Sequence, residues 1–158
     1  MKRFLLAVVA LVAATASVFA QGGKDEVRFY VMKATIDGVD VTKQIEGKGV
    51  YTVFYEQDGE IYMANVWEAT HSQSWGPIRK LRHKSVDATD KEYGRDEYLF
   101  EWSYKNTYDK EKGVSKVLLS KVYTPNGVVS VLKILLKSGS LTEYVGYMDG
   151  SLDLSKTK

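Results

Sequence analysis

A regular alternation of aromatic residues in positions 97–104 constrains the fold of this chain more than any other feature. Tyr98, Phe100, Trp102 and Tyr104 occupy every second position, so an extended strand places all four rings on one face. A helix would scatter the same rings around its axis. The segment therefore predicts a β-strand with one buried face.

The same period of two, bounded by turn residues, recurs along the chain. Asp37-Gly38, residues 57–59 and residues 124–127 are the clearest turn signals. An eighth strand, less regular and interrupted at Gly76-Pro77, is expected in residues 74–86. The only helical candidate, residues 41–45 with Asp40 as its cap, is one or two turns long. Seven strands are expected at 26–36, 50–56, 60–68, 97–104, 114–123, 128–136 and 141–148.

Eight sequential strands joined by short turns predict an antiparallel up-and-down meander. Such a sheet has two exposed edges, and closure into a barrel removes both. We therefore expect one all-β domain, a closed barrel of about eight strands, with a two-sheet sandwich as the alternative. The tail at residues 155–158 is expected to be frayed.

The first twenty residues have the features of an export signal. Lys2 and Arg3 precede an apolar run at residues 4–14, and Val18-Phe19-Ala20 offers the small residues of a cleavage site. The run is about half as long as a membrane span requires. We expect residues 1–20 to be removed and residues 21–158 to fold, without a membrane span, in the periplasm or outside the cell.

Composition excludes several classes of function. The chain has no cysteine, which removes disulfides, thiolate metal sites and cysteine nucleophiles. Without Lys2 and Arg3 the 22 basic residues fall to 20, equal to the 20 acidic residues. A neutral mature chain argues against binding nucleic acid or an acidic membrane through a broad positively charged surface.

The export signal, the strand count and the hairpin spacing across residues 26–148 resemble lipocalin-like, or calycin, β-barrels. The aromatic strand at 98–104 belongs to the same resemblance, which is closest to the small exported versions found in Bacteroidetes. It is a resemblance of architecture: residues 26–30, Glu-Val-Arg-Phe-Tyr, stand where lipocalins carry a Gly-x-Trp signature. The resemblance implies a barrel that holds a small hydrophobic ligand.

Aromatic residues supply the first candidate site. Their rings bring apolar area and, in tyrosine and tryptophan, a polar handle for a ligand inside the barrel. The alternative is ordinary core packing, since half-buried strands favour aromatic residues. The predicted ligand-binding residues are Tyr98, Phe100, Trp102, Tyr104, Tyr51 and Trp67.

A basic stretch and a nearby tryptophan supply the second candidate site. Arg79, Lys80 and Arg82 lie in a run of four cations in six residues, which suits an acidic partner. Trp75 lies in residues 69–76, an expected loop, where it serves as an exposed anchor or as a plug over one barrel end. The alternative is a solvated strand neutralised by the acidic residues that follow.

Neither catalysis nor metal binding has a signature in this sequence. His71 and His83 are the only histidines, and their spacing matches no metal motif. Glu97 and Glu101 lie about 13 Å apart along a strand, beyond the roughly 5–9.5 Å of glycosidase carboxylates. No Gly-x-Ser-x-Gly elbow is present. We therefore assign no catalytic residue, metal ligand or cofactor.

These observations favour an exported, non-enzymatic, monomeric barrel that binds a small or hydrophobic ligand and no nucleic acid. The alternative is an exported protein-interaction module, such as a protease inhibitor or a partner in envelope assembly.

Overall fold

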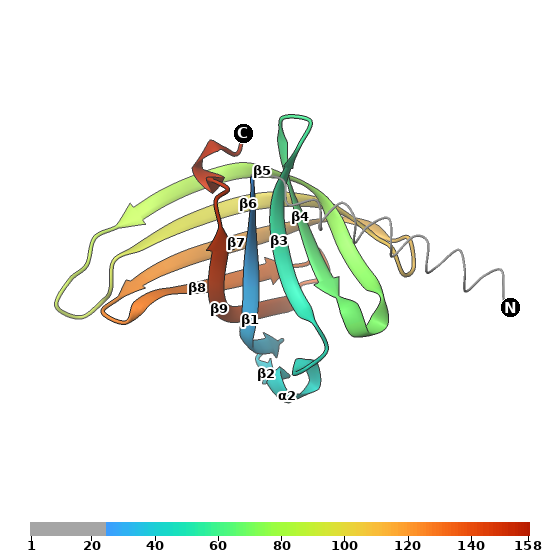
Figure 1. Ribbon diagram of the computed structural model, residues 1–158, viewed down its shortest axis with the longest axis horizontal. Coiled ribbons are helices and arrows are strands. Elements are labelled where there is room, and N and C mark those ends of the chain that lie inside the picture. Colours follow the sequence, from blue (N-terminus) through green and yellow to red (C-terminus); the bar gives the residue numbers. More distant parts are fainter. Residues whose placement is uncertain (1–24) are drawn as a thin grey trace, which may run out of the picture.

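The strands follow one another around a closed antiparallel barrel (Figure 1). Each pairs with the next along the chain, and the last pairs with the first, which confirms the predicted barrel and excludes the sandwich. The computed structural model describes residues 25–158, so the predicted signal peptide lies outside the described residues. The barrel strands are β1 (Glu26–Ile36), β3 (Val50–Gln57), β4 (Glu60–Trp67), β5 (Ser72–Val86), β6 (Arg95–Asn106), β7 (Lys112–Thr124), β8 (Gly127–Leu135) and β9 (Leu141–Gly150).

Two Asp-Gly turns set the register of neighbouring strands. Asp58 and Gly59 have φ angles of 53° and 76°, which is the conformation of a two-residue hairpin turn with both φ values positive. This turn pairs Gln57 with Glu60 and hence Tyr55 with Tyr62. Asp37-Gly38 makes the corresponding turn between β1 and the two-residue strand β2 (Val39–Asp40).

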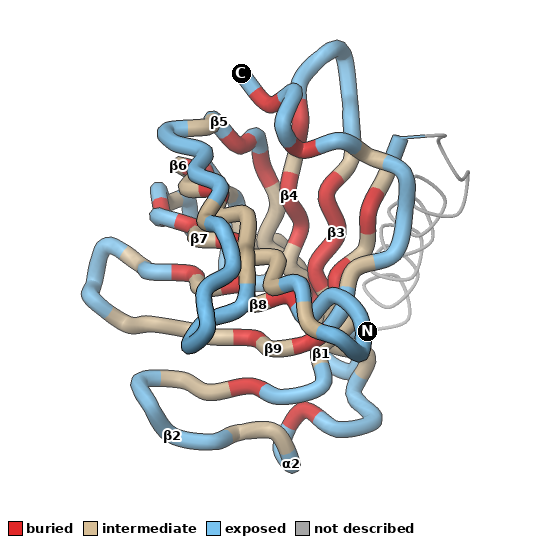
Figure 2. Tube along the Cα trace, turned by 90° about the vertical axis from the view of Figure 1, so that its left-hand side faces the viewer, coloured by how far each residue is buried: buried red, intermediate tan, exposed pale blue. Residues whose placement is uncertain are grey.

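The inward face of the strands forms one continuous core. Figure 2 shows the buried positions along the middle of the strands and the exposed positions at the hairpin tips. Burial of these apolar side chains, at about 25 cal/mol per Å², is the main force that closes the barrel. The side chains with no exposed surface in this core are Phe29, Ala34, Phe54, Met63, Phe100, Val117, Leu119 and Leu132.

Short helical segments cover the two ends of the barrel. At one end lies α2 (Thr42–Ile45), which inserts the buried side chain of Ile45 into the core. At the other end lies η2 (Leu154–Lys156), whose Leu154 is 1% exposed. The predicted helix is thus confirmed, whereas the prediction of a frayed tail is wrong. The tail is held because the amide of Lys80 donates to the carbonyl oxygen of Lys158 over 2.7 Å.

The expected loop at residues 69–76 is largely a strand. The 3-10 turn η1 (Glu68–Thr70) and His71 are the whole connection, and β5 then runs continuously from Ser72 to Val86. Gly76-Pro77 interrupts the sequence pattern, but Trp75 and Ile78 on either side both pair with β6. Trp75 is therefore a strand residue on the barrel wall, and not a plug over an end.

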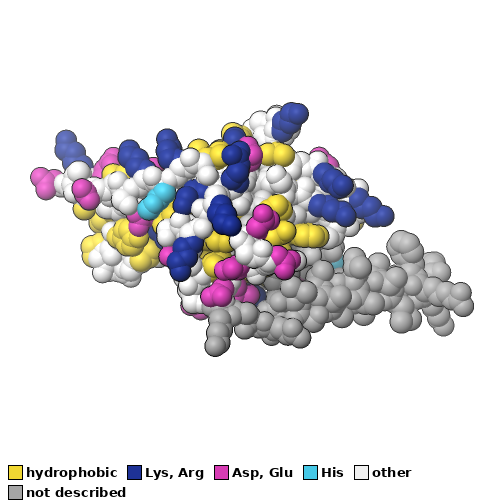
Figure 3. All heavy atoms as spheres, turned by 90° about the horizontal axis from the view of Figure 1, so that it is seen from above, with side chains coloured by type: hydrophobic (Ala, Val, Ile, Leu, Met, Phe, Trp, Pro, Cys, Tyr) yellow, Lys and Arg dark blue, Asp and Glu magenta, His cyan; other side chains and the backbone are white. Residues whose placement is uncertain are grey.

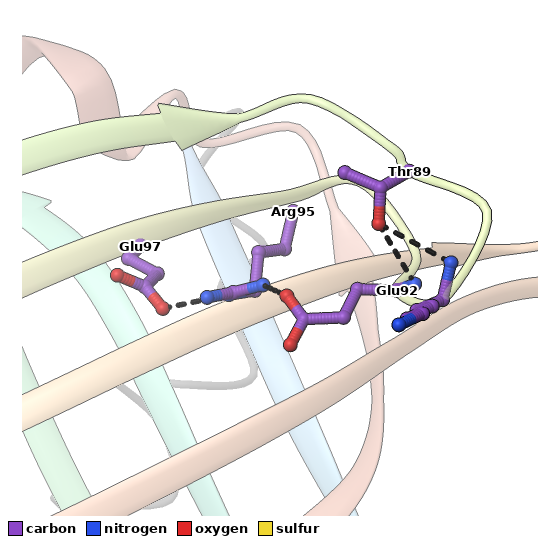
Figure 4. A network of polar contacts seen from close by, with 5 residues as sticks. Thr89, Glu92, Arg95 and Glu97 are labelled. Atoms are coloured by element: carbon purple, nitrogen blue, oxygen red, sulfur yellow. Dashed lines mark hydrogen bonds and ion pairs between the residues drawn. The ribbon is translucent and has the colours of Figure 1, made fainter.

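Strands β5 to β8 extend beyond the barrel as two long hairpins, at the left of Figure 1. At the tip of the β5–β6 hairpin, Thr89 Oγ1 accepts hydrogen bonds from the amides of Lys91 and Glu92. Arg95 then bridges Glu92 and Glu97, at 3.3 and 2.8 Å (Figure 4). The hydrogen bond from Arg95 lowers the pKa of Glu97, so this carboxylate stays ionised within the network.

Candidate functional site

The predicted ligand-binding rings that face inward pack against one another. Phe100 lies 6.4 Å from Phe54 between ring centroids, and Trp102 lies 4.9 Å from Tyr104. Trp67 and Tyr104 are partly buried and pack against the same core. Tyr98, Phe100 and Trp102 are at most 7% exposed. The structure therefore brings these five residues into the apolar core inside the barrel.

Tyr51 does not belong to this group. It pairs with Tyr30 and Val66 and lies on the outer face of β3, where it packs against Val53. The guanidinium carbon of Arg28 lies 4.6 Å from the centre of its ring. Burial raises the pKa of the Tyr51 hydroxyl, which therefore stays protonated at neutral pH. The prediction that Tyr51 lies inside the barrel is wrong. Side chains alternate along β3, and Thr52 and Phe54 face the interior, so Tyr51 faces outward.

Three polar side chains inside the barrel form a hydrogen-bond network, whereas the buried hydroxyls of Ser115 and Ser130 have no hydrogen-bond partner among the described residues. The Thr52 hydroxyl donates to Asn65 Oδ1 over 3.2 Å, and Asn65 Nδ2 donates to the Tyr144 hydroxyl over 3.5 Å. Burial raises the pKa of Tyr144. This network joins three strands and orders the interior.

An unexpected row of aromatic rings lies on the outside of the barrel wall. Tyr55 on β3, Tyr62 on β4 and Trp75 on β5 follow one another across adjacent strands. Their centroids are 5.6 and 6.4 Å apart, with ring planes 26° and 28° from parallel. Burial raises the pKa of Tyr55 to about 12, so its hydroxyl is neutral at any physiological pH. We call these three residues the outer aromatic row.

A shallow, open depression of about 350 Å³ lies at the Trp75 end of this row. We call it the Trp75 depression. Gly76, Ser103 and Gly113 lie in the strands that line it. Its other lining residues are Tyr62, Trp75, Pro77, Tyr104, Lys105 and Lys112.

The predicted basic site is divided by the strand on which it lies. Arg79 points outward and donates to Glu101 over 2.9 Å. Lys80 pairs with Phe100 on the inward face, and its Nζ donates to the carbonyl oxygen of Ser155. Because Arg79 and Lys80 are engaged within the chain and point to opposite faces, they do not form one basic surface with Trp75.

Arg82 is exposed on the projecting part of β5, beyond the bulge at Leu81. On the face shown in Figure 3, Lys and Arg side chains are spread among acidic and apolar ones. This distribution offers separate basic positions and not one continuous patch.

A polar cluster lies on the inward face of the projecting hairpins. Asp96 accepts hydrogen bonds of 2.5 Å from both Ser85 and Tyr123, and His83 Nε2 lies 3.5 Å from its Oδ1. The ring of His83 stacks on Tyr98 with centroids 4.4 Å apart. Ser85 donates to the carboxylate and not to the imidazole, so the arrangement stabilises the Asp96 anion instead of activating a nucleophile. The hydrogen bond from Ser85 and then that from Tyr123 lower the pKa of Asp96.

The carboxylates considered from the sequence are held in ion pairs. Glu101 lies between Arg79 and Lys116, and Glu97 accepts from Arg95. Within residues 25–158 no group of three or more acidic or histidine side chains is arranged to hold a metal ion.

Sequence reasoning missed Tyr55, Tyr62, Lys105 and Lys112. One signal could have found the first two, because the Asp58-Gly59 turn fixes Tyr55 opposite Tyr62. Trp75 joins them only through the β4–β5 register, and Lys105 faces Lys112 across a longer turn. Those two registers are set by packing of the whole wall and not by a short motif.

The fold and the site together define a closed eight-stranded antiparallel barrel with a continuous apolar core and an aromatic depression on its outer wall. No family model, no curated protein and no solved structure matches the chain. No helix in residues 25–158 is long and apolar enough to cross a membrane.

Proposed function

We propose that this protein is an exported, non-enzymatic binding protein whose target binds the outer wall around Trp75. The observation that carries the proposal is the contrast between the two faces of the barrel. Inward-facing rings are packed into a core, whereas the Trp75 depression is open to solvent and lined by aromatic side chains.

The chemistry of the depression supports a binding role. Its volume of about 350 Å³ lies within the range of ligand sites, roughly 300–1,000 Å³. Tryptophan and tyrosine are enriched among the residues that dominate binding energy, because they offer large rigid contact areas. The outer aromatic row extends the contact surface across three strands.

The test compares the wild-type protein with Trp75→Ala on a support exposed to the envelope fraction of the producing cells. We expect the wild type to retain a defined component, protein or carbohydrate, that the variant does not retain. Val129→Ala, at an exposed position on β8, is the matched control and should behave as the wild type. Equal retention by Trp75→Ala and the wild type would contradict the proposal.

The rival proposal, a small hydrophobic ligand inside the barrel, has the lipocalin-like architecture in its favour. It requires that core rings such as Phe100 and Trp102 move to admit the ligand. Native mass spectrometry of protein purified from its own host distinguishes the two. A stoichiometric bound species that is lost on unfolding, and kept by Trp75→Ala, would favour the interior site.

A further inference from the structure

On the outer wall, two lysines on neighbouring strands lie directly opposite each other. Lys105 on β6 and Lys112 on β7 are direct cross-strand partners, and neither forms an ion pair with a described residue. Like charges placed directly opposite each other destabilise a sheet. The free protein therefore holds an unfavourable arrangement at this position.

Other lysines on the same wall show what the ordinary arrangement is. Lys116 Nζ lies 3.0 Å from Glu101 Oε2, and Lys133 Nζ lies 2.8 Å from Glu143 Oε2. Each of these lysines faces a carboxylate on a neighbouring strand. Lys105 and Lys112 are an exception to this arrangement, because each has the other lysine as its cross-strand partner.

The exception lies at the rim of the Trp75 depression. Trp75 is the cross-strand partner of Lys105, and both lysines line the hollow together with Tyr62 and Pro77. Two ammonium groups beside an aromatic surface suit a ligand that joins a negative charge to a ring with a flat apolar face. A carboxylate between the lysines would also relieve their repulsion.

From this geometry we propose that the Trp75 depression binds an acidic polysaccharide through its uronic acid units. The axial C–H face of the sugar ring stacks on Trp75, and its carboxylate lies between Lys105 and Lys112. The open, shallow shape accommodates a unit within a longer chain, since neighbouring units can continue along the wall. This inference rests on the proposed function and names the class of its target.

An acidic peptide is the less favoured ligand for a structural reason. Peptides commonly bind β-proteins by adding a strand to a free sheet edge. Here β4, β5, β6 and β7 are paired on both sides in a closed barrel. A polysaccharide does not depend on such an edge, because side-chain stacking and ion pairing supply its contacts.

Calorimetric titration of the full chain with polygalacturonate, with fully methyl-esterified polygalacturonate and with poly-glutamate tests the inference. We expect binding of polygalacturonate only, weakened about tenfold or more in the Lys105→Gln/Lys112→Gln variant, in line with the loss of charge-assisted contacts. Trp75→Ala should weaken it similarly. The control Lys116→Gln/Lys133→Gln removes as much charge from the same wall and should change affinity less than about twofold if the effect is local.

Thermal unfolding shows whether the test variant is folded. Replacing the two lysines relieves their repulsion, so we expect the melting temperature of Lys105→Gln/Lys112→Gln to equal or exceed that of the wild type.

Equal losses of affinity for polygalacturonate in both double variants would overturn the inference, as would binding of the methyl ester. Binding of poly-glutamate in place of polygalacturonate would also overturn it. Absence of polygalacturonate binding, with Trp75-dependent retention of envelope material intact, would refute the ligand class and leave the proposed function standing.

Discussion

The indole Nε1 of Trp102 donates a hydrogen bond of 3.1 Å to the carbonyl oxygen of Met63 inside the barrel. This contact joins β6 to β4 across the intervening strand β5. It is possible because Gly76, the partner of Met63 on β5, carries no side chain. Trp102 is 2% exposed, so its ring fills core volume and satisfies a buried acceptor at once.

Replacing Trp102 by phenylalanine tests this relationship. The variant leaves the Met63 carbonyl without its indole donor and leaves part of the indole volume empty. We expect the free energy of unfolding to fall by about 2 to 4 kcal/mol. Urea denaturation measures the change. Trp75→Phe on the outer wall is the control and should cost less than about 1 kcal/mol; a comparable loss in both variants would contradict the role of the buried hydrogen bond.

Gly76 is required by the close approach of β5 and β6. A Cβ atom at this position would lie 1.8 Å from the carbonyl oxygen of Ser103. Gly76→Ala therefore forces the two strands apart, and we expect it to cost about 2 to 3 kcal/mol of unfolding free energy. At Gly94 the nearest atom is 3.3 Å away, so Gly94→Ala should stay within about 1 kcal/mol. Equal unfolding midpoints for the two variants would show that β5 and β6 can separate at Gly76 at little energetic cost.

The barrel could be predicted because its signals are local. The alternation in residues 97–104 predicts a strand there, and the Asp58-Gly59 turn predicts the hairpin around it. The predicted strand ends lie within a residue or two of those observed. The interior position of Phe100 and Trp102 follows from the same parity. Closure itself follows from the meander, since eight strands with unpaired edges are less stable than eight strands in a ring.

The binding surface could not be predicted because it depends on register between strands. Trp75 looked like a loop residue, since Gly76-Pro77 breaks the alternation after it, yet pairing with Ala64 and Lys105 on both sides keeps it in a strand. The tail looked frayed because its sequence is short and polar. Leu154 holds it in place through a contact with the core that no pattern in the tail discloses.

Leu154 closes one end of the barrel, and its removal should open that end. Leu154→Ala exposes the neighbouring core side chains to water, and we expect a loss of about 2 to 4 kcal/mol in unfolding free energy. Leu135 is 43% exposed, so Leu135→Ala should cost less than about 1 kcal/mol. Hydrogen exchange would locate the effect. The amide of Lys80, which donates to Lys158, should lose its protection first; unchanged protection at Lys80 would show that the tail does not depend on Leu154.

The hydrogen bonds at Asp96 give the protein a defined response to acid. Ser85 makes the largest contribution to the lowered pKa of Asp96, and Tyr123 the next. A carboxyl group with a lowered pKa in the folded state adds stability above its unfolded pKa of about 3.9, and this stability is lost as pH falls through the folded pKa. We expect Asp96→Asn to flatten the acid limb of a plot of unfolding free energy against pH.

Carboxylate titration by NMR separates the two donors to Asp96. Ser85→Ala should raise the pKa of Asp96 toward its ordinary value, and Tyr123→Phe should raise it by a smaller amount. Asp153, whose pKa is lowered by Ser155 and not by this cluster, is the internal control, and its pKa should not change.

The same hydrogen bond has a second effect at high pH, because the bond to Asp96 raises the pKa of Tyr123 to about 12. Tyr123 therefore adds stability below pH of about 10 that is lost as its folded pKa is approached. In Asp96→Asn the pKa of Tyr123 should fall toward 10, as followed by tyrosinate absorbance; a value unchanged in this variant would mean that the carboxylate does not hold the tyrosine proton.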